Sequence, residues 1–157
     1  MKIFSLLLSI LFVITACSEN TSYPKAQNFD LIDAKSNSFQ LTDYKGKAVV
    51  VIFWATWCPY CAKIMPKLEQ YYLQFQKQGL EIIAVNINED GDPIAHMKYH
   101  DFTYRLGLDG DKVAEQWQVT GTPTLVFINR KGEIIGRNQI SEPESIIIKN
   151  LIAKILE

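Results

Sequence analysis

The chain has 157 residues, with 16 Lys and Arg against 17 Asp and Glu and a formal net charge of −1. This near-neutral balance, without any basic run, excludes a typical nucleic-acid-binding protein. The length suits one domain with its own hydrophobic core. With only three cysteines, the core must supply stability that a disulfide-rich chain takes from its bridges.

Residues 1–16 predict a lipoprotein signal peptide. A positive start, Met1-Lys2, precedes an apolar stretch at 3–13, which is shorter than the about 20 residues that span a bilayer. The residues Ile14-Thr15-Ala16-Cys17 resemble a bacterial lipobox, which implies cleavage before Cys17 and lipid on that cysteine. The alternative is an ordinary signal peptide with an incidental cysteine.

The polar residues 17–27 then read as a lipid anchor and tether, followed by one domain at 28–157. Lipid on Cys17 would account for the odd cysteine of an exported protein and leave Cys58 and Cys61 as a pair. We therefore expect a protein of the bacterial cell envelope that faces the periplasm. Ser18 slightly favours the outer membrane.

The domain is predicted to begin with a short hairpin, a turn, a buried strand and a long helix. These elements occupy residues 29–32 with 38–41, then 45–47, 48–54 and about 58–78. The later elements are a strand at 80–88, short helices at 93–100 and 111–117, a strand at 124–128, a turn at 129–132, a strand at 133–140, and a helix from 142 or 143 to 156. A parallel βαβ unit followed by a hairpin and a helix indicates an α/β fold. Its mixed central sheet is flanked by helices and preceded by an N-terminal hairpin.

Two cysteines lie where the buried strand gives way to the helix, in Cys58-Pro59-Tyr60-Cys61. Free backbone N–H groups and the helix dipole favour negative charge there, so the first cysteine is placed to act as a thiolate. Pro59 costs the helix little at this position, since its missing N–H would have no helical partner.

The order of elements, this dithiol and Gly121-Thr122-Pro123-Thr124 together resemble the thioredoxin fold, and more narrowly the TlpA-type thiol–disulfide oxidoreductases. The resemblance covers about residues 28–155. It rests on the segments at 45–51, 53–58, 65–66, 84–87 and 123–129, with Gly132.

The resemblance implies roles for the residues around the dithiol. Cys58 would be the exposed attacking thiol and Cys61 the buried resolving thiol, with Pro59 and Tyr60 setting the redox potential. The Thr122–Pro123 bond would be cis, leaving the backbone of Thr122 to pair with a substrate chain. Trp57 would form part of the docking surface.

The resemblance also implies partners. We expect protein thiol or disulfide substrates, a membrane electron donor, attachment to the membrane through lipid, and a monomer. No cofactor is expected beyond the Cys58–Cys61 disulfide, and no metal. A role as reductant, as in cytochrome c maturation, is implied by analogy.

One position departs from classical thioredoxins, which carry a buried Asp where this chain has Ile52. Some TlpA-type proteins carry a Glu after the second strand instead, and Glu89 falls there. Glu89 then tunes the dithiol, or it is a solvated loop acid like its neighbours Asp90 and Asp92.

Three other functions fit parts of the same pattern. A disulfide oxidase or isomerase would share the chemistry and differ in redox potential, whereas a non-enzymatic carrier would use the dithiol to bind metal or haem. A zinc site with His96 and His100 is disfavoured, because roughly 34 residues separate Cys61 from His96 against about 12–15 in familiar zinc fingers.

A thiol peroxidase of related fold would show Pro-x3-Thr-x2-Cys. This chain has Val51 and Ala55 at the Pro and Thr positions, so the sequence disfavours a peroxidase.

Overall fold

The computed structural model describes residues 22–157. The predicted signal peptide at 1–16, the lipidation site Cys17 and the first part of the predicted 17–27 tether lie outside this range. Within it, no helix is both long enough and apolar enough to cross a membrane.

A five-stranded mixed sheet forms the centre of the domain, in the order β5-β4-β3-β6-β7. The strands are β3 (Ala48–Trp54), β4 (Leu80–Asn86), β5 (Arg105–Gly107), β6 (Thr124–Ile128) and β7 (Ile134–Asn138). β4 runs parallel to β3 and β5, whereas β6 runs antiparallel to β3 and β7. All seven residues of the central β3 are buried, which explains its continuous apolar run in place of an alternating pattern.

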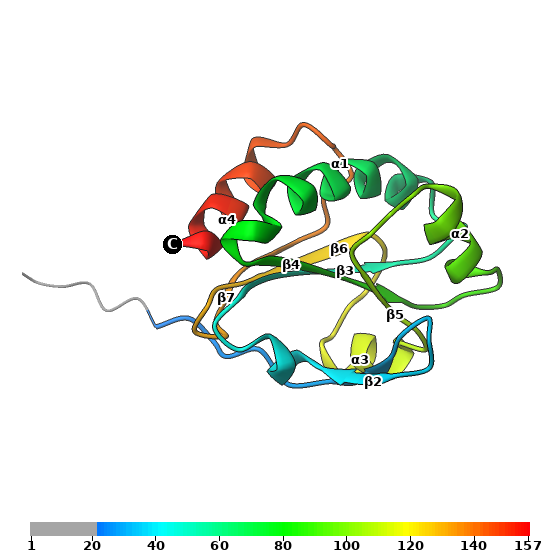
Figure 1. Ribbon diagram of the computed structural model, residues 1–157, viewed down its shortest axis with the longest axis horizontal. Helices are drawn as coiled ribbons and strands as arrows, with labels where there is room; N and C mark the ends of the chain where they lie inside the picture. The colour runs from blue at the N-terminus through cyan, green and yellow to red at the C-terminus, as the bar shows by residue number, and fades with distance from the viewer. Residues whose placement is uncertain (1–21) are drawn as a thin grey trace, which may run out of the picture.

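Helices cover both faces of the sheet (Figure 1). On one face lie α1 (Pro59–Phe75), continued by the 3₁₀ turn η2 (Gln76–Gln78), together with α2 (Pro93–Tyr99) and α4 (Ile146–Leu156). On the other lie α3 (Asp111–Gln116) and the hairpin of β1 (Asp30–Ile32) and β2 (Ser38–Gln40), followed by η1 (Leu41–Tyr44). Alternate residues of β3 point into the two layers, Val50 and Ile52 toward α1 and α4, Val51 and Phe53 toward α3 and the hairpin.

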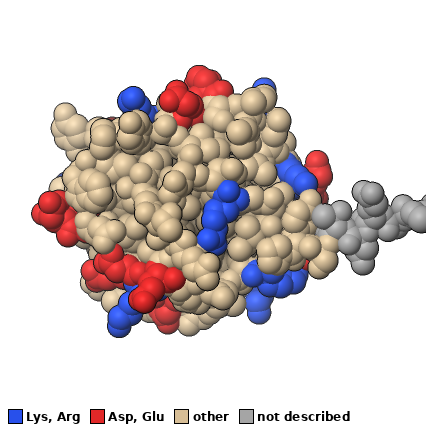
Figure 2. Space-filling model, turned by 180° about the vertical axis from the view of Figure 1, so that it is seen from behind, with Lys and Arg blue, Asp and Glu red and all other residues tan. Residues whose placement is uncertain are grey.

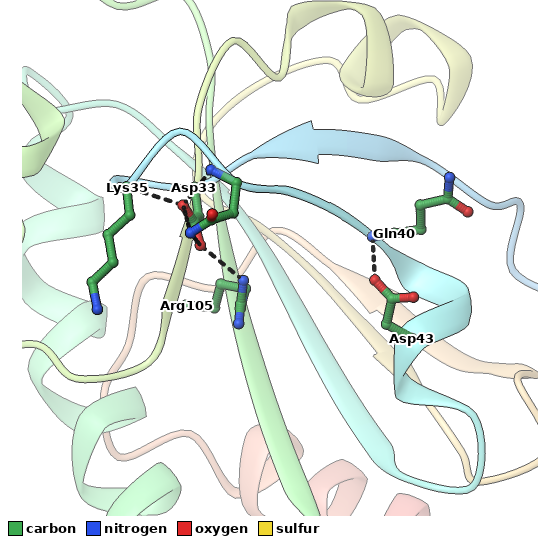
Figure 3. A network of polar contacts seen from close by, with 6 residues as sticks. Asp33, Lys35, Gln40, Asp43 and Arg105 are labelled. Atoms are coloured by element: carbon green, nitrogen blue, oxygen red, sulfur yellow. Dashed lines mark hydrogen bonds and ion pairs between the residues drawn. The ribbon is translucent and has the colours of Figure 1, made fainter.

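The N-terminal hairpin is fastened to the edge strand β5. Its turn residue Asp33 accepts hydrogen bonds from the backbone N–H groups of Lys35 (2.8 Å) and Asn37 (3.0 Å), and from the guanidinium of Arg105 on β5 (3.1 Å). Figure 3 shows Arg105 reaching from the sheet edge to this turn. Leu31 packs so closely over Gly107 that a Cβ there would lie 2.7 Å from its Cδ1.

The predicted fold class is confirmed, and β3 and β6 have the predicted bounds. The strand β5 was not predicted, and the last helix begins at Ile146 because residues 143–144 form a turn. β4 ends two residues earlier than predicted, at Asn86, and the chain then turns at Asn88, whose φ is +49°.

Candidate active site

The two cysteines lie at the junction of β3 and α1. Cys58 is the N-cap residue of α1, and its Sγ accepts a hydrogen bond from the backbone N–H of Cys61 at 3.2 Å. Both cysteines are free thiols in this structure. The capping bond brings one sulfur against the positive end of a helix, where negative charge on Cys58 is favoured.

The prediction that Cys58 is exposed is wrong. Its residue is 3% exposed, against 1% for Cys61. As the cap of α1, the Cys58 side chain folds back over the first helical turn and joins the core cluster of that face. Its neighbours Trp57 (53% exposed) and Tyr60 (54% exposed) carry the accessible surface. A partner therefore meets two aromatic side chains around a recessed sulfur.

The environments of the two thiols differ. Burial raises the pKa of Cys61 to about 12, and a hydrogen bond with Cys58 acts in the same direction. The backbone of Ala55 and the side chain of Thr122 act oppositely and more weakly. Cys61 is therefore a protonated thiol at neutral pH, as a resolving cysteine must be until the first thiol has reacted.

The Thr122–Pro123 peptide bond is cis, as predicted. Pro123 is buried, and Thr122 is partly exposed. Beside the dithiol lies a hollow of about 340 Å³, lined by Tyr60, residues 120–123, Gln139 and Ser141, which we call the substrate groove. Among residues 22–157 no charged side chain lines this groove.

Glu89 is not a simple solvated loop acid. Its carboxylate accepts hydrogen bonds from the backbone N–H (2.9 Å) and hydroxyl (2.5 Å) of Thr56, and from the Asn86 amide (2.6 Å). The backbone N–H groups of Asp90 (3.0 Å) and Gly91 (2.9 Å) complete the set. Partial burial raises the pKa of Glu89, but these hydrogen bonds outweigh burial and lower the pKa to about 2.

Through these contacts Glu89 joins the segment that follows β4 to the segment that precedes Cys58. A second link lies nearby: the indole N–H of Trp57 donates to the carbonyl of Asn88 at 2.7 Å, and the N–H of Asn88 donates to Asp111 at 2.8 Å. The two links hold the dithiol loop against the segment after β4 and, through Asn88, against the start of α3.

The position taken by Asp in classical thioredoxins is fully buried here as Ile52, so no carboxylate approaches the dithiol from the strand. His96 packs on Trp54 (ring centroids 5.1 Å apart) and on His100 (4.6 Å). Within the described range, no three His, Cys, Asp or Glu side chains are grouped so that they could hold a metal ion.

Sequence reasoning missed the residues that hold Glu89 and those that complete the groove. Only Asn86 gave a usable signal in the sequence: an amide at the end of an apolar strand is expected to be buried and to need a hydrogen-bond partner. In the structure Asn86 is 3% exposed. Thr56, Gln139 and Ser141 carried no local signal, since their roles depend on chain segments that meet only in the fold.

Comparisons with known proteins give the family and the fold of this chain. The sequence matches the AhpC/TSA family over residues 24–137. It is 37% identical over 112 residues to the thiol-disulfide oxidoreductase ResA of Bacillus subtilis, spanning 70% of this chain and 63% of that protein's length. The ResA of Halalkalibacterium halodurans is 34% identical over 154 residues, covering 85% of each chain. Among solved structures, a thioredoxin family thiol:disulfide interchange protein from Chlorobium tepidum has a TM-score of 0.77 at 23% identity, covering 88% of this chain and 99% of its own.

Proposed function

Since this chain belongs to the AhpC/TSA family of thioredoxin-like proteins, we propose that it is an oxidoreductase that exchanges thiols and disulfides on exported protein substrates. The observation that carries the proposal is the pair of inequivalent thiols at the start of α1: Cys58 caps the helix, and Cys61 is held neutral one turn further on.

Reduction of a substrate begins at Cys58. Its thiolate attacks one sulfur of the substrate disulfide, so that a Cys58–substrate bond forms and the other substrate sulfur leaves as a thiolate. Cys61 then loses its proton and attacks the Sγ of Cys58, which releases the second substrate sulfur. The substrate has gained two electrons, and the protein holds a Cys58–Cys61 disulfide.

The difference between the thiols supports this order. Because the pKa of Cys61 is raised to about 12, Cys61 does not compete as the first nucleophile at neutral pH. Formation of the mixed disulfide removes the Cys58 thiol, which contributes to that raised pKa through its hydrogen bond and its charge. Cys61 therefore becomes easier to deprotonate at the step that needs it.

The substrate groove supports the docking of a peptide segment beside the dithiol. Thr122 lines the groove and lies before the cis bond, so its backbone can pair with an extended substrate strand. Tyr60 and Trp57 supply exposed aromatic surface next to Cys58. The uncharged lining favours a neutral stretch of chain around the substrate cysteine.

We assign the direction as reduction, by analogy with the TlpA-type proteins that the sequence resembles. A reductant in the periplasm needs a membrane donor, because that compartment is kept oxidising. Apocytochrome c, whose cysteines must stay reduced for haem attachment, is the substrate that this analogy favours. Lipid on Cys17 would hold the protein at the membrane.

The test is the equilibrium potential of the Cys58–Cys61 couple, measured on the full chain in detergent against glutathione or dithiothreitol. A value near about −270 mV, like that of thioredoxin, supports a reductant. A value near about −120 mV, like that of a strong oxidant, overturns this direction and makes the protein a disulfide-forming enzyme.

A parallel assay separates catalysis from passive binding. Substrate turnover should stop with Cys58→Ser, whereas Cys61→Ser should accumulate a mixed disulfide with the substrate. Tight stoichiometric binding of metal or haem without turnover would instead favour a dithiol carrier.

A further inference from the structure

The dithiol lies at one end of the domain. At the opposite end, the strands β3 and β4 begin, and the helix α4 and the helix α1 with its continuation η2 end. We call this end the basal pole. Arg130 ties it together: its guanidinium donates to the carbonyls of Gly46 (3.2 Å), Gln78 (2.6 Å) and Leu156 (3.3 Å). Three separate segments of the chain thus converge on this pole.

The basal pole carries several basic side chains, and the acidic Glu81, Glu133 and Glu157 lie at the same end. A cavity of about 220 Å³ there is lined by Lys25, Lys45, Lys47, Arg130 and Lys131, and within the described range no acidic residue lines it. Figure 2 shows basic side chains close to the start of the described chain, with an acidic group beside them, and acidic and basic groups together toward the opposite side.

Two of these lysines form no ion pair within residues 22–157, although the charge of Lys131 helps to lower the pKa of Glu133. Lys25 pairs with Glu133 at 3.3 Å, and Lys47 pairs with Glu81 at 2.5 Å. The side chains of Lys45 and Lys131 are exposed and enter no ion pair among the described residues.

The N-terminal segment is fastened to the same pole. The N–H of Ala26 donates to the carbonyl of Gly132 (2.9 Å), and the N–H of Ile134 donates to that of Pro24 (2.8 Å). The ammonium of Lys154, near the end of α4, donates to the Tyr23 hydroxyl at 2.7 Å. Residues 1–21, which hold the predicted membrane-targeting segment, therefore connect to the domain at its basal pole and not at the dithiol.

This attachment limits the distance to a membrane. Five residues lead from Cys17 to Ser22, and an extended chain spans about 3.3–3.6 Å per residue, or at most about 18 Å in all. A tether of this length lets the basic surface approach a bilayer to within the Debye length, about 8–10 Å at physiological ionic strength, over which anionic headgroups attract it.

We propose that the basal pole is a docking surface for anionic phospholipid headgroups, with the exposed side chains of Lys45 and Lys131 as its main contacts. Docking turns the dithiol away from the bilayer. The seven residues of β3, at about 3.3 Å each, separate the basal pole from Cys58 by about 23 Å. Substrate cysteines then reach Cys58 from the aqueous side.

The test is lysine labelling on vesicles. The full chain is reconstituted into vesicles of phosphatidylcholine alone or with about a third phosphatidylglycerol, flotation confirms attachment, and an amine-reactive ester reports each lysine by mass spectrometry. Labelling of Lys45 and Lys131 should fall several-fold on anionic vesicles only and recover in about 1 M salt, where the Debye length is about 3 Å. Lys112 and Lys149, on α3 and α4 away from the basal pole, should label equally on both.

Charge reversal supplies the matched control. Lys25, which lines the same cavity, should also be protected in the wild type on anionic vesicles. The double variant Lys45→Glu/Lys131→Glu should lose this protection of Lys25, whereas Lys112→Glu/Lys149→Glu, with the same change in net charge, should keep it. The first variant should exchange disulfides in solution at the wild-type rate, so failure of docking and failure of the proposed enzymatic function are read separately.

Two results would overturn the docking proposal. One is equal labelling of Lys45 and Lys131 on neutral and anionic vesicles to which the protein is attached. The other is equal protection of these lysines by inorganic phosphate on neutral vesicles, which would mean that the pole binds soluble anions and not a lipid surface.

Discussion

Replacing Glu89 by Gln should destabilise the folded protein while leaving its shape almost unchanged. Each carboxylate oxygen of Glu89 accepts at least two hydrogen bonds, one oxygen from Thr56 and Asn86, the other from Thr56, Asp90 and Gly91. A Gln side chain must turn its NH₂ group toward one of these sets, so donors would face donors whichever way the amide is placed.

The size of the effect follows from the pKa of Glu89. The drop from its usual value of 4.5 to about 2 corresponds to about 3 kcal/mol of stabilisation by the charged form. Glu89 is partly exposed, and solvent screening reduces this to about 2 kcal/mol. Because the pKa is lowered in the folded state, this stability is fully present above about pH 4.5 and is lost as the pH falls toward about 2.

The assay is urea unfolding of the wild type, Glu89→Gln and the control Asp90→Asn, followed by tryptophan fluorescence from pH 7 down to about pH 3. Glu89→Gln should lower the free energy of unfolding by about 2 kcal/mol at pH 7, and the gap should narrow to about half or less by pH 3. Asp90→Asn, on an exposed side chain, should stay within about 0.5 kcal/mol of the wild type. A Glu89→Gln protein as stable as the wild type at pH 7, or a gap independent of pH, would refute the reasoning.

Three further outcomes are expected. A brief exposure of the reduced protein to iodoacetamide at neutral pH should modify Cys58 before Cys61, because burial raises the pKa of Cys61 to about 12. Peptide mass spectrometry gives the order of labelling, and labelling of Cys61 first would contradict the assigned order. Gly110→Ala should destabilise the folded protein by about 1–3 kcal/mol and lower its melting temperature, because the new Cβ would clash with a methyl carbon of Val85. Calorimetry measures the melting temperature, and an unchanged value would contradict the packing described. Arg130→Ala should destabilise the fold by about 1–3 kcal/mol in urea unfolding and leave the rate of disulfide exchange in solution unchanged, since its three carbonyl contacts lie at the basal pole.

Much of the fold could be predicted because its signals are local. The β-branched and aromatic run at 48–54 forms a buried strand wherever helices cover both faces of a sheet, and Pro59 and Gly79 mark a helix start and a helix end by their own backbone preferences. β5 carried no such signal. Arg105–Gly107 is a strand because it pairs with Ile83–Val85 of β4, and that pairing depends on the path of a long connection.

By itself the sequence determined the order of the elements other than β5, and the position of the dithiol at a strand–helix junction. It also determined the position of Thr122–Pro123 in the chain, since each of these depends on neighbouring residues alone. Only the tertiary structure decided the surroundings of these residues. It buried Cys58, the N-cap of α1, in the core, placed five donors around Glu89, and brought Lys25, Lys45 and Lys131 to one pole. Burial, hydrogen bonding and local charge are set by segments far apart in the chain, so they exist only once the sheet has brought those segments together.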